Sequence, residues 1–155
     1  MKKFLTTALF LLSSTVFAQT MSKVTGYQAI VTLGNARGIT PALTEDALKA
    51  LKVNTAAYKV VNEKLRISPD VFSRLFAAGN TAVPVVLLTR AVLESATGKT
   101  LTDAAVAELI RQNPSIAVTN TASLITLIAN TELATLANAA AALATQPITP
   151  RGGGN

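Results

Sequence analysis

The conventional catalytic side chains in this 155-residue sequence are eight carboxylates, because the chain contains neither histidine nor cysteine. Without histidine there can be no Ser-His-Asp triad, no imidazole general base and no His-ligated zinc. Without cysteine there is no thiolate nucleophile, no disulfide and no Cys-ligated iron–sulfur cluster. No serine is followed three residues later by lysine, so a Ser-Lys nucleophile pair of that spacing is also missing. These absences exclude many of the common enzyme classes.

Each carboxylate has a structural explanation. Five fall in the first turn of an expected helix, where negative charge is favourable: Glu45, Asp46, Asp70, Asp103 and Glu132. The other three lie three or four residues from a base and are expected to form ordinary surface ion pairs: Glu63 with Lys59 and Arg66, Glu94 with Arg90, and Glu108 with Arg111. The acids form no calcium loop. We therefore predict no catalytic, cofactor-binding or metal-binding residue and no enzymatic activity.

The segment Leu93-Glu94-Ser95 resembles the Glu-Ser catalytic pair of lytic transglycosylases, which are exported enzymes that cut peptidoglycan. The resemblance covers three residues, and the Gly-Leu-Met-Gln type of segment expected downstream is absent. It implies a peptidoglycan-acting hydrolase that uses Glu94, which we keep as a remote alternative. Pairing with Arg90 argues against it, because a glycosidase general acid must keep its proton near neutral pH and ion pairing favours the ionised carboxylate.

The segment Gly98-Lys99-Thr100 resembles the end of a phosphate-binding P-loop, but the opening glycine of that motif would fall on Leu93. A helix end explains these residues better. Gly98 is expected to end a helix, and Lys99 is expected to lie near the negative end of that helix dipole.

The first eighteen residues have the composition of a signal peptide. Lys2 and Lys3 form a basic region, an apolar run extends from Phe4 to Leu12, and Val16-Phe17-Ala18 fits a cleavage site. The apolar run is shorter than the roughly 20 residues that span a membrane. We therefore expect residues 1–18 to be removed and the chain to be exported to the periplasm or secreted.

Residues 19–145 are expected to form a single helical domain, followed by a disordered Pro/Gly tail over 146–155. Half of the full chain is hydrophobic and 14% is charged, against roughly 25% charged residues in soluble chains. Loss of Lys2 and Lys3 lowers the formal net charge from +6 to +4. The chain is basic because acids are scarce, and its bases are scattered, so no nucleic-acid partner is expected.

Residues typical of helix starts and helix ends recur along the chain. They predict an all-α fold, a compact bundle of about six short helices. The expected helix starts are Thr44, Asn54 or Thr55, Ser68 and Thr102, and the expected ends are Gly79, Gly98 and Asn113-Pro114. The sequence Ser68-Pro69-Asp70 combines a cap, a proline in the first helical position and an acid. The helix that follows carries Phe72 and Phe76, which we expect to anchor the core.

A central helix is expected over roughly residues 81–97, because its apolar residues leave no continuous polar face. The alternative is a buried strand over Val83 to Thr89, since periodicity does not separate short apolar runs into helix and strand. The continuation to Gly98 favours the helix. We expect Phe72 and Phe76 to pack against it.

The segment from Ser115 to Thr145 carries a single charge, Glu132. Its apolar stripe breaks at Asn130-Thr131, which predicts two successive capped helices or one kinked helix. No transmembrane segment is expected in the mature chain, because the apolar content here is largely alanine diluted by asparagine and threonine.

The stretch over residues 23–40 is ambiguous. The run from Tyr27 to Leu33 fits either a strand or a helix stopped by Gly34, and residues 34–38 are expected to form a loop in both cases. We favour the helix.

These observations favour a non-enzymatic envelope or secreted protein that needs no cofactor. The first hypothesis is a protein–protein interaction or self-association through the charge-poor segment from Ser115 to Thr145. The alternative is weak binding to anionic surfaces, such as lipid headgroups or cell-wall polymers, through scattered bases: Lys49, Lys52, Lys59, Lys64, Arg66 and Arg74.

Overall fold

A computed structural model describes residues 20–39, 44–53 and 55–145, so the expected signal peptide and the expected tail lie outside the described residues. The helices are α2 (Gly26–Ala36), α3 (Glu45–Ala50), α4 (Thr55–Leu65), α5 (Pro69–Ala78), α6 (Val85–Thr97), α7 (Asp103–Gln112), α8 (Thr121–Ile128) and α9 (Leu133–Thr145). Two strands, β1 (Met21–Thr25) and β2 (Ala82–Pro84), and two short 3-10 turns, Leu51–Val53 and Pro114–Ile116, complete the described elements. The all-α class is confirmed. The described residues form eight helices where about six were expected, because the ambiguous stretch over residues 23–40 contains a helix and the segment 115–145 forms two helices and not one kinked helix.

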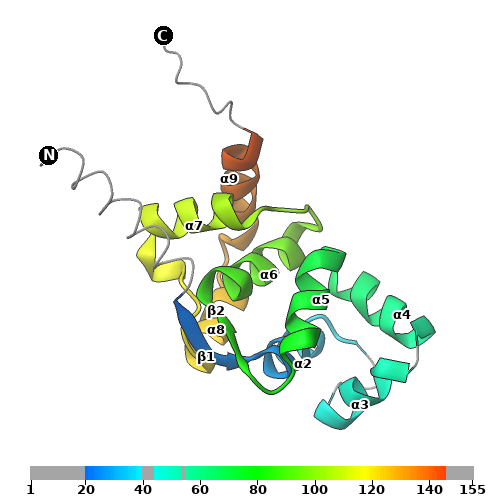
Figure 1. Ribbon diagram of the computed structural model, residues 1–155. Coiled ribbons are helices and arrows are strands. Elements are labelled where there is room, and N and C mark those ends of the chain that lie inside the picture. The colour runs from blue at the N-terminus through cyan, green and yellow to red at the C-terminus, as the bar shows by residue number, and fades with distance from the viewer. Residues whose placement is uncertain (1–19, 40–43, 54, 146–155) are drawn as a thin grey trace, which may run out of the picture.

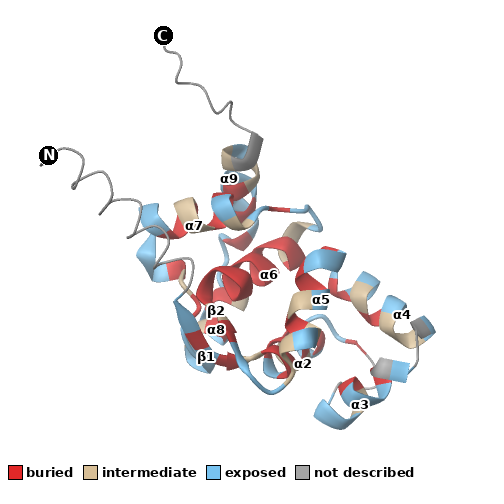
Figure 2. Cartoon of the chain, in the orientation of Figure 1, coloured by how far each residue is buried: buried red, intermediate tan, exposed pale blue. Residues whose placement is uncertain are grey.

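Helix α6 is the centre of the molecule, as predicted. Eleven of its residues, from Val85 to Ser95, are buried. Helices α7, α8 and α9 contact it on one side, and α2 and α5 contact it on the other. Figure 2 shows α6 as the most continuously buried element, in keeping with a sequence that is apolar nearly all round.

The expected start of this helix was wrong, because residues 82–84 form a strand. β2 pairs antiparallel with β1, with Met21 opposite Pro84 and Thr25 opposite Ala82, and the register is irregular between these pairs. Pro84 has extended backbone angles at the N-cap position. The residue before a proline is also kept out of the helical region, so the helix begins only at Val85.

Helix α2 continues past Gly34, which the sequence analysis had taken as its end. Gly38, with φ +69°, is the residue that ends it. The N–H of Ile39 donates to the carbonyl of Gly34 and the N–H of Gly38 donates to that of Asn35, which is a Schellman motif. The helix assignment is therefore confirmed, whereas residues 34–36 are helical and not a loop.

The aromatic residues gather between α2, α4 and α5. Phe72 and Phe76 are stacked with their ring centroids 5.9 Å apart, and Tyr58 meets both rings edge-on at 4.7 and 5.2 Å. Tyr27 of α2 lies 5.9 Å from Phe76. Helix α5 contacts α6. The aromatic partners of its two phenylalanines lie on α2, on α4 and within α5 itself, since α6 carries no aromatic residue.

Helices α8 and α9 are separate, and the expected break at Asn130-Thr131 is confirmed. Leu124, Leu127 and Leu133 are buried in the core, and α9 packs against both α6 and α7. Within the described residues no single helix is long and apolar enough to cross a membrane, although α8 and α9, bent by 96° at their junction, pass that test as a pair.

Candidate functional site

The carboxylate of Glu94 is fully buried, with 0% of its surface exposed. Its Oε1 accepts a hydrogen bond of 2.7 Å from the backbone N–H of Ser68. Its Oε2 accepts one of 2.9 Å from Nε of Arg90 and one of 2.8 Å from the backbone N–H of Leu101. The expectation that Arg90 pairs with Glu94 is confirmed, but the expectation of a surface pair was wrong. An i, i+4 pair on a helix that is apolar nearly all round has no solvent-exposed face to occupy.

Arg90 extends this buried pair to two partly exposed acids. Its NH1 lies 3.2 Å from Asp70 and 2.9 Å from Asp103, the acids in the first turns of α5 and α7. NH1 of Arg74 lies 3.5 Å from Asp70 and 2.9 Å from Asp103. The cluster therefore joins the N-termini of α5 and α7 to α6.

The electrostatics of this cluster favour the charged guanidinium of Arg90. Burial by itself lowers the pKa of Arg90. Hydrogen bonds to Asp103 and Glu94 and the charges of both acids raise it by more, so the pKa stands above its ordinary value. Both charges of the Arg90–Glu94 pair thus have hydrogen-bonding partners, which a buried ion pair requires.

The surroundings of Glu94 differ from those that a general acid requires. All three groups that approach the carboxylate are N–H donors, and all belong to the chain itself. A general acid must carry a proton and reach a substrate oxygen. Glu94 reaches no open surface, because 0% of its own surface is exposed.

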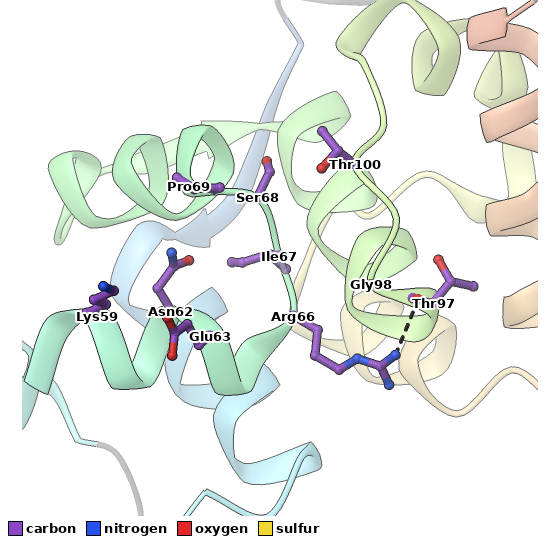
Figure 3. Close-up of a pocket in the computed structure, with 10 residues that line it drawn as sticks. All are labelled: Lys59, Asn62, Glu63, Arg66, Ile67, Ser68, Pro69, Thr97, Gly98 and Thr100. Carbon is purple, nitrogen blue, oxygen red and sulfur yellow. Dashed lines mark hydrogen bonds between the residues drawn. The ribbon is translucent and has the colours of Figure 1, made fainter.

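An open cleft of about 550 Å³ lies beside this cluster, between α4, the N-terminus of α5 and the C-terminal end of α6 (Figure 3). Its lining residues are Lys59, Asn62, Glu63, Arg66, Ile67, Ser68, Pro69, Thr97, Gly98 and Thr100. Ser68 belongs to both features, because it lines the cleft while its N–H binds Glu94. The buried cluster therefore holds one wall of the cleft in place.

Arg66 lies at the edge of the cleft in a strained backbone conformation. Its φ is +62°, in the left-handed region that glycine usually occupies after a helix. Its NH2 donates to the carbonyl of Thr97 at 3.3 Å (Figure 3), and its guanidinium lies against Gly98. Gly98 ends α6 in the left-handed conformation, as predicted.

Lys99 directly follows the C-cap Gly98, as expected, but the cation whose side chain binds a carbonyl at the C-terminus of α6 is Arg66. Nζ of Lys99 instead donates to Oδ1 of Asn138 on α9, at 3.1 Å. The favourable charge comes from Arg66, the residue after α4, which the order of residues around Gly98 does not reveal.

Positive charge at this end of α6 is concentrated. Arg37 donates to Oγ of Ser95 at 2.9 Å. Burial lowers the pKa of Arg37, and the positive charge of Arg66 lowers it further. Within the part of the chain that the structure describes, Arg37, Lys59 and Arg66 form no ion pair.

Asn62 supplies the unsatisfied polar atom of the cleft. Its Oδ1 is buried and has no hydrogen-bond partner among the described residues. Figure 3 shows the side chain pointing from α4 toward the segment 67–69, between Lys59 and Arg66. A buried acceptor without a donor costs free energy, on the order of 1–3 kcal/mol. This atom is where a bound molecule could contribute a donor.

The other predicted charges are placed as follows. Glu45 and Asp46 lie in the first turn of α3, as expected, while Glu132 lies just before α9. Glu108 pairs with Arg111 on the surface, also as expected. Glu63 forms no ion pair with Lys59 or Arg66 among the described residues.

The bases named for anionic surfaces divide into two groups. Lys49, Lys59, Lys64 and Arg66 are exposed, whereas Arg74 is held by Asp70 and Asp103. The side chain of Lys52 lies outside the described residues. The cleft was not predicted from the sequence, because it forms only where α4 and the start of α5 meet the C-terminal end of α6 in the folded chain. The residue after α4, an arginine where glycine is common, was the local signal.

No family model, no curated protein and no solved structure matches the chain.

Proposed function

We propose that the protein is an exported, non-enzymatic binding domain and that the cleft between α4, α5 and α6 is its binding site. The observation that carries this proposal is the contrast between two neighbouring features. The carboxylate of Glu94 is saturated by donors from the chain itself. In the described part of the chain, the cleft beside it offers Lys59 and Arg66 without an ion-pair partner and an unsatisfied buried acceptor on Asn62.

The buried Arg90–Glu94 pair supports the wall of the cleft without occupying the cleft, an arrangement that suits binding. The Arg90–Glu94 pair fixes Ser68 and the connection to α7, so the cleft wall is built before any ligand arrives. Preorganised walls reduce the ordering cost of binding. The volume of about 550 Å³ lies within the range of small-molecule sites. Export rests on the basic and apolar composition of the first eighteen residues.

Titration of the ¹⁵N-labelled mature chain with a panel of small anionic, neutral and cationic compounds tests this proposal. We expect chemical-shift changes over residues 59–69 and 97–100, with the backbone of α8 unchanged as the internal control. A panel that perturbs only residues outside the cleft would contradict the binding-site assignment. A peptidoglycan gel that clears with the native chain and stays opaque with Glu94→Gln would contradict the non-enzymatic assignment.

A second candidate function is self-association through the α8–α9 surface. Apart from Glu132, the segment from Ser115 to Thr145 carries no charge. Ile125 of α8 is 54% exposed. The exposed alanines Ala139 and Ala142 of α9 form a small-residue surface, while Ala137 and Ala140 are buried within the chain. Small residues allow helices to approach closely, and a second copy would cover the exposed ones.

Sedimentation velocity at two salt concentrations tests self-association. An uncharged contact should persist or strengthen as salt rises from about 0.05 to 0.5 M, because screening weakens only charge-dependent association. We expect Ile125→Lys to shift the chain toward monomer, and Val53→Lys, a matched change at an exposed valine on the 3-10 turn Leu51–Val53, to leave it unchanged. A native chain that stays monomeric at every concentration up to about 100 μM would remove this candidate.

A further inference from the structure

We propose that the cleft binds a small hydroxylated oxyanion of the size of a sugar acid or sugar phosphate, with its anionic group at Arg66 and a hydroxyl donating to Oδ1 of Asn62. The inference rests on the proposed function and gives the chemical class of the ligand. Three observations on the described residues carry it: the uncompensated cations, the strained position of Arg66 and the unsatisfied acceptor.

The anionic group is assigned to the Arg66 end of the cleft. A guanidinium has five N–H donors. Among the residues that the structure describes, that of Arg66 makes a single hydrogen bond, the 3.3 Å contact to the carbonyl of Thr97. The remaining donors suit a planar carboxylate or a phosphate, which arginine binds through two parallel hydrogen bonds. Arg37 adds positive charge nearby, as its lowered pKa, caused first by burial and then by Arg66, indicates.

The strained backbone of Arg66 supports a role beyond folding. A left-handed conformation costs a residue with a side chain roughly 1–2 kcal/mol, which glycine would avoid. Such strain is commonly retained where a side chain must be presented to a ligand. The φ of +62° directs the Arg66 side chain across the cleft edge to the end of α6.

The hydroxyl is assigned to the middle of the cleft. Oδ1 of Asn62 needs a donor, and the neighbouring Glu63 offers a second acceptor on the same wall. Acceptors flanked by the cations Lys59 and Arg66 match a molecule that carries hydroxyl groups along with its anionic group. An oxyanion without hydroxyl groups would offer no donor to Asn62, and a neutral sugar would offer no anionic group to Arg66.

Isothermal titration of the mature chain with D-glucuronate, D-glucose 6-phosphate, D-glucose and inorganic phosphate tests the proposal. We expect at least one of the two sugar anions to bind, with a Kd on the order of 1 mM or below. We expect glucose and phosphate to bind at least about tenfold more weakly, because each satisfies only one half of the site. The two sugar anions separate a carboxylate ligand from a phosphate ligand.

Three variants locate the binding. Arg66→Gly fits the left-handed backbone and removes the guanidinium, and we expect it to weaken the sugar anions by about tenfold or more. Asn62→Leu should weaken the sugar anions and leave the binding of phosphate unchanged. Arg111→Gln, which removes an exposed arginine from α7, is the control and should bind like the native chain. Circular dichroism of each variant shows that it is folded.

The outcomes separate this inference from the proposed function. Equal binding of glucose and glucuronate, or sugar-anion binding that survives Arg66→Gly in a folded chain, would overturn the ligand class. If the ¹⁵N titration instead shows neutral or cationic compounds in the cleft, the binding domain stands and the oxyanion proposal fails. If no compound perturbs the cleft, both fail.

Discussion

The backbone N–H of Ser68 lies 2.7 Å from Oε1 of Glu94, although the two residues are 26 positions apart. Ser68 is the N-cap of α5, so the start of that helix is held against the second half of α6. The other oxygen of the same carboxylate binds the N–H of Leu101, just before α7. One buried side chain therefore fixes the relative positions of three helices.

Removing this carboxylate should destabilise the fold strongly. Glu94→Ala removes the buried partner of Arg90, which keeps only the partly exposed Asp70 and Asp103, and leaves the N–H groups of Ser68 and Leu101 unpaired. This predicts a loss of about 3–5 kcal/mol in the free energy of unfolding. Glu94→Gln should also destabilise, because its amide nitrogen would face an N–H donor. Urea unfolding at pH 7 measures both changes.

The matched control is Glu108→Gln, which breaks an Arg–Glu pair on the surface of α7. Exposed pairs contribute about 0–1 kcal/mol, so this variant should unfold close to the native midpoint. If Glu94→Gln and Glu108→Gln lost the same free energy, the buried cluster would not have the structural role described here.

The central position of α6 predicts that Leu87→Ala is among the most destabilising apolar substitutions. Leu87 is 2% exposed, and truncation of a buried leucine to alanine typically costs about 2–5 kcal/mol. Val53→Ala is the control, because Val53 is 91% exposed. A loss below about 1 kcal/mol for Leu87→Ala, measured by denaturant unfolding, would contradict the central role of α6.

Helix boundaries were largely predictable because they depend on residues adjacent in sequence. Thr44, Ser68 and Thr102 each cap a helix through the side-chain oxygen, as expected from their types and from the acids that follow. The exceptions were Gly34 and Pro84, where a second local signal, Gly38 or the residue before the proline, decided the boundary. Each candidate boundary had a sound local reason, but where two candidates lay close together only the structure shows which one ends or starts the helix.

The candidate site was not predictable in the same way, because burial and cleft formation depend on tertiary contacts. The pairing of Arg90 with Glu94 follows from their spacing, but the two further N–H donors to Glu94 come from residues outside α6. The charge that complements the end of α6 likewise comes from Arg66 after α4. The spacing of residues in the sequence identifies side chains that are neighbours on one helix. It does not identify which other segment of the chain packs against those side chains.

The close approach of α2 and α5 predicts a severe effect of Gly26→Ala. A Cβ at Gly26 would lie 1.9 Å from the backbone carbonyl oxygen of Leu75. Backbone cannot move aside as a flexible side chain can, so the two helices would have to separate. We expect a loss of about 1–3 kcal/mol or more, the cost of overpacking.

Gly38→Ala separates this steric effect from backbone strain. Gly38 has φ +69°, and a Cβ there meets no atom within 4 Å. Its substitution should cost only the left-handed strain, roughly 1–2 kcal/mol. Thermal unfolding of both variants measures the difference; a smaller loss for Gly26→Ala than for Gly38→Ala would contradict the close helix contact.

The surface pair of Glu108 and Arg111 predicts a pH effect of defined sign. The hydrogen bond from Arg111 lowers the pKa of Glu108, an effect that burial partly opposes and a hydrogen bond from Gln112 supports. A carboxyl whose pKa is lower in the folded chain stabilises the fold above its unfolded value, about 4.3. That contribution is lost as the pH falls through the folded pKa. It is small, because both side chains are more than a third exposed.

NMR titration of the Glu108 carboxyl carbon checks the sign directly. In the native chain the midpoint should lie below about 4.3, and 1 M salt should move it upward, because ions screen an exposed pair at that concentration within roughly 3 Å. Arg111→Gln should raise the midpoint toward the ordinary value, since it removes the principal donor and its charge. A midpoint that is unchanged by both salt and Arg111→Gln would show that the ion pair does not set the titration of Glu108.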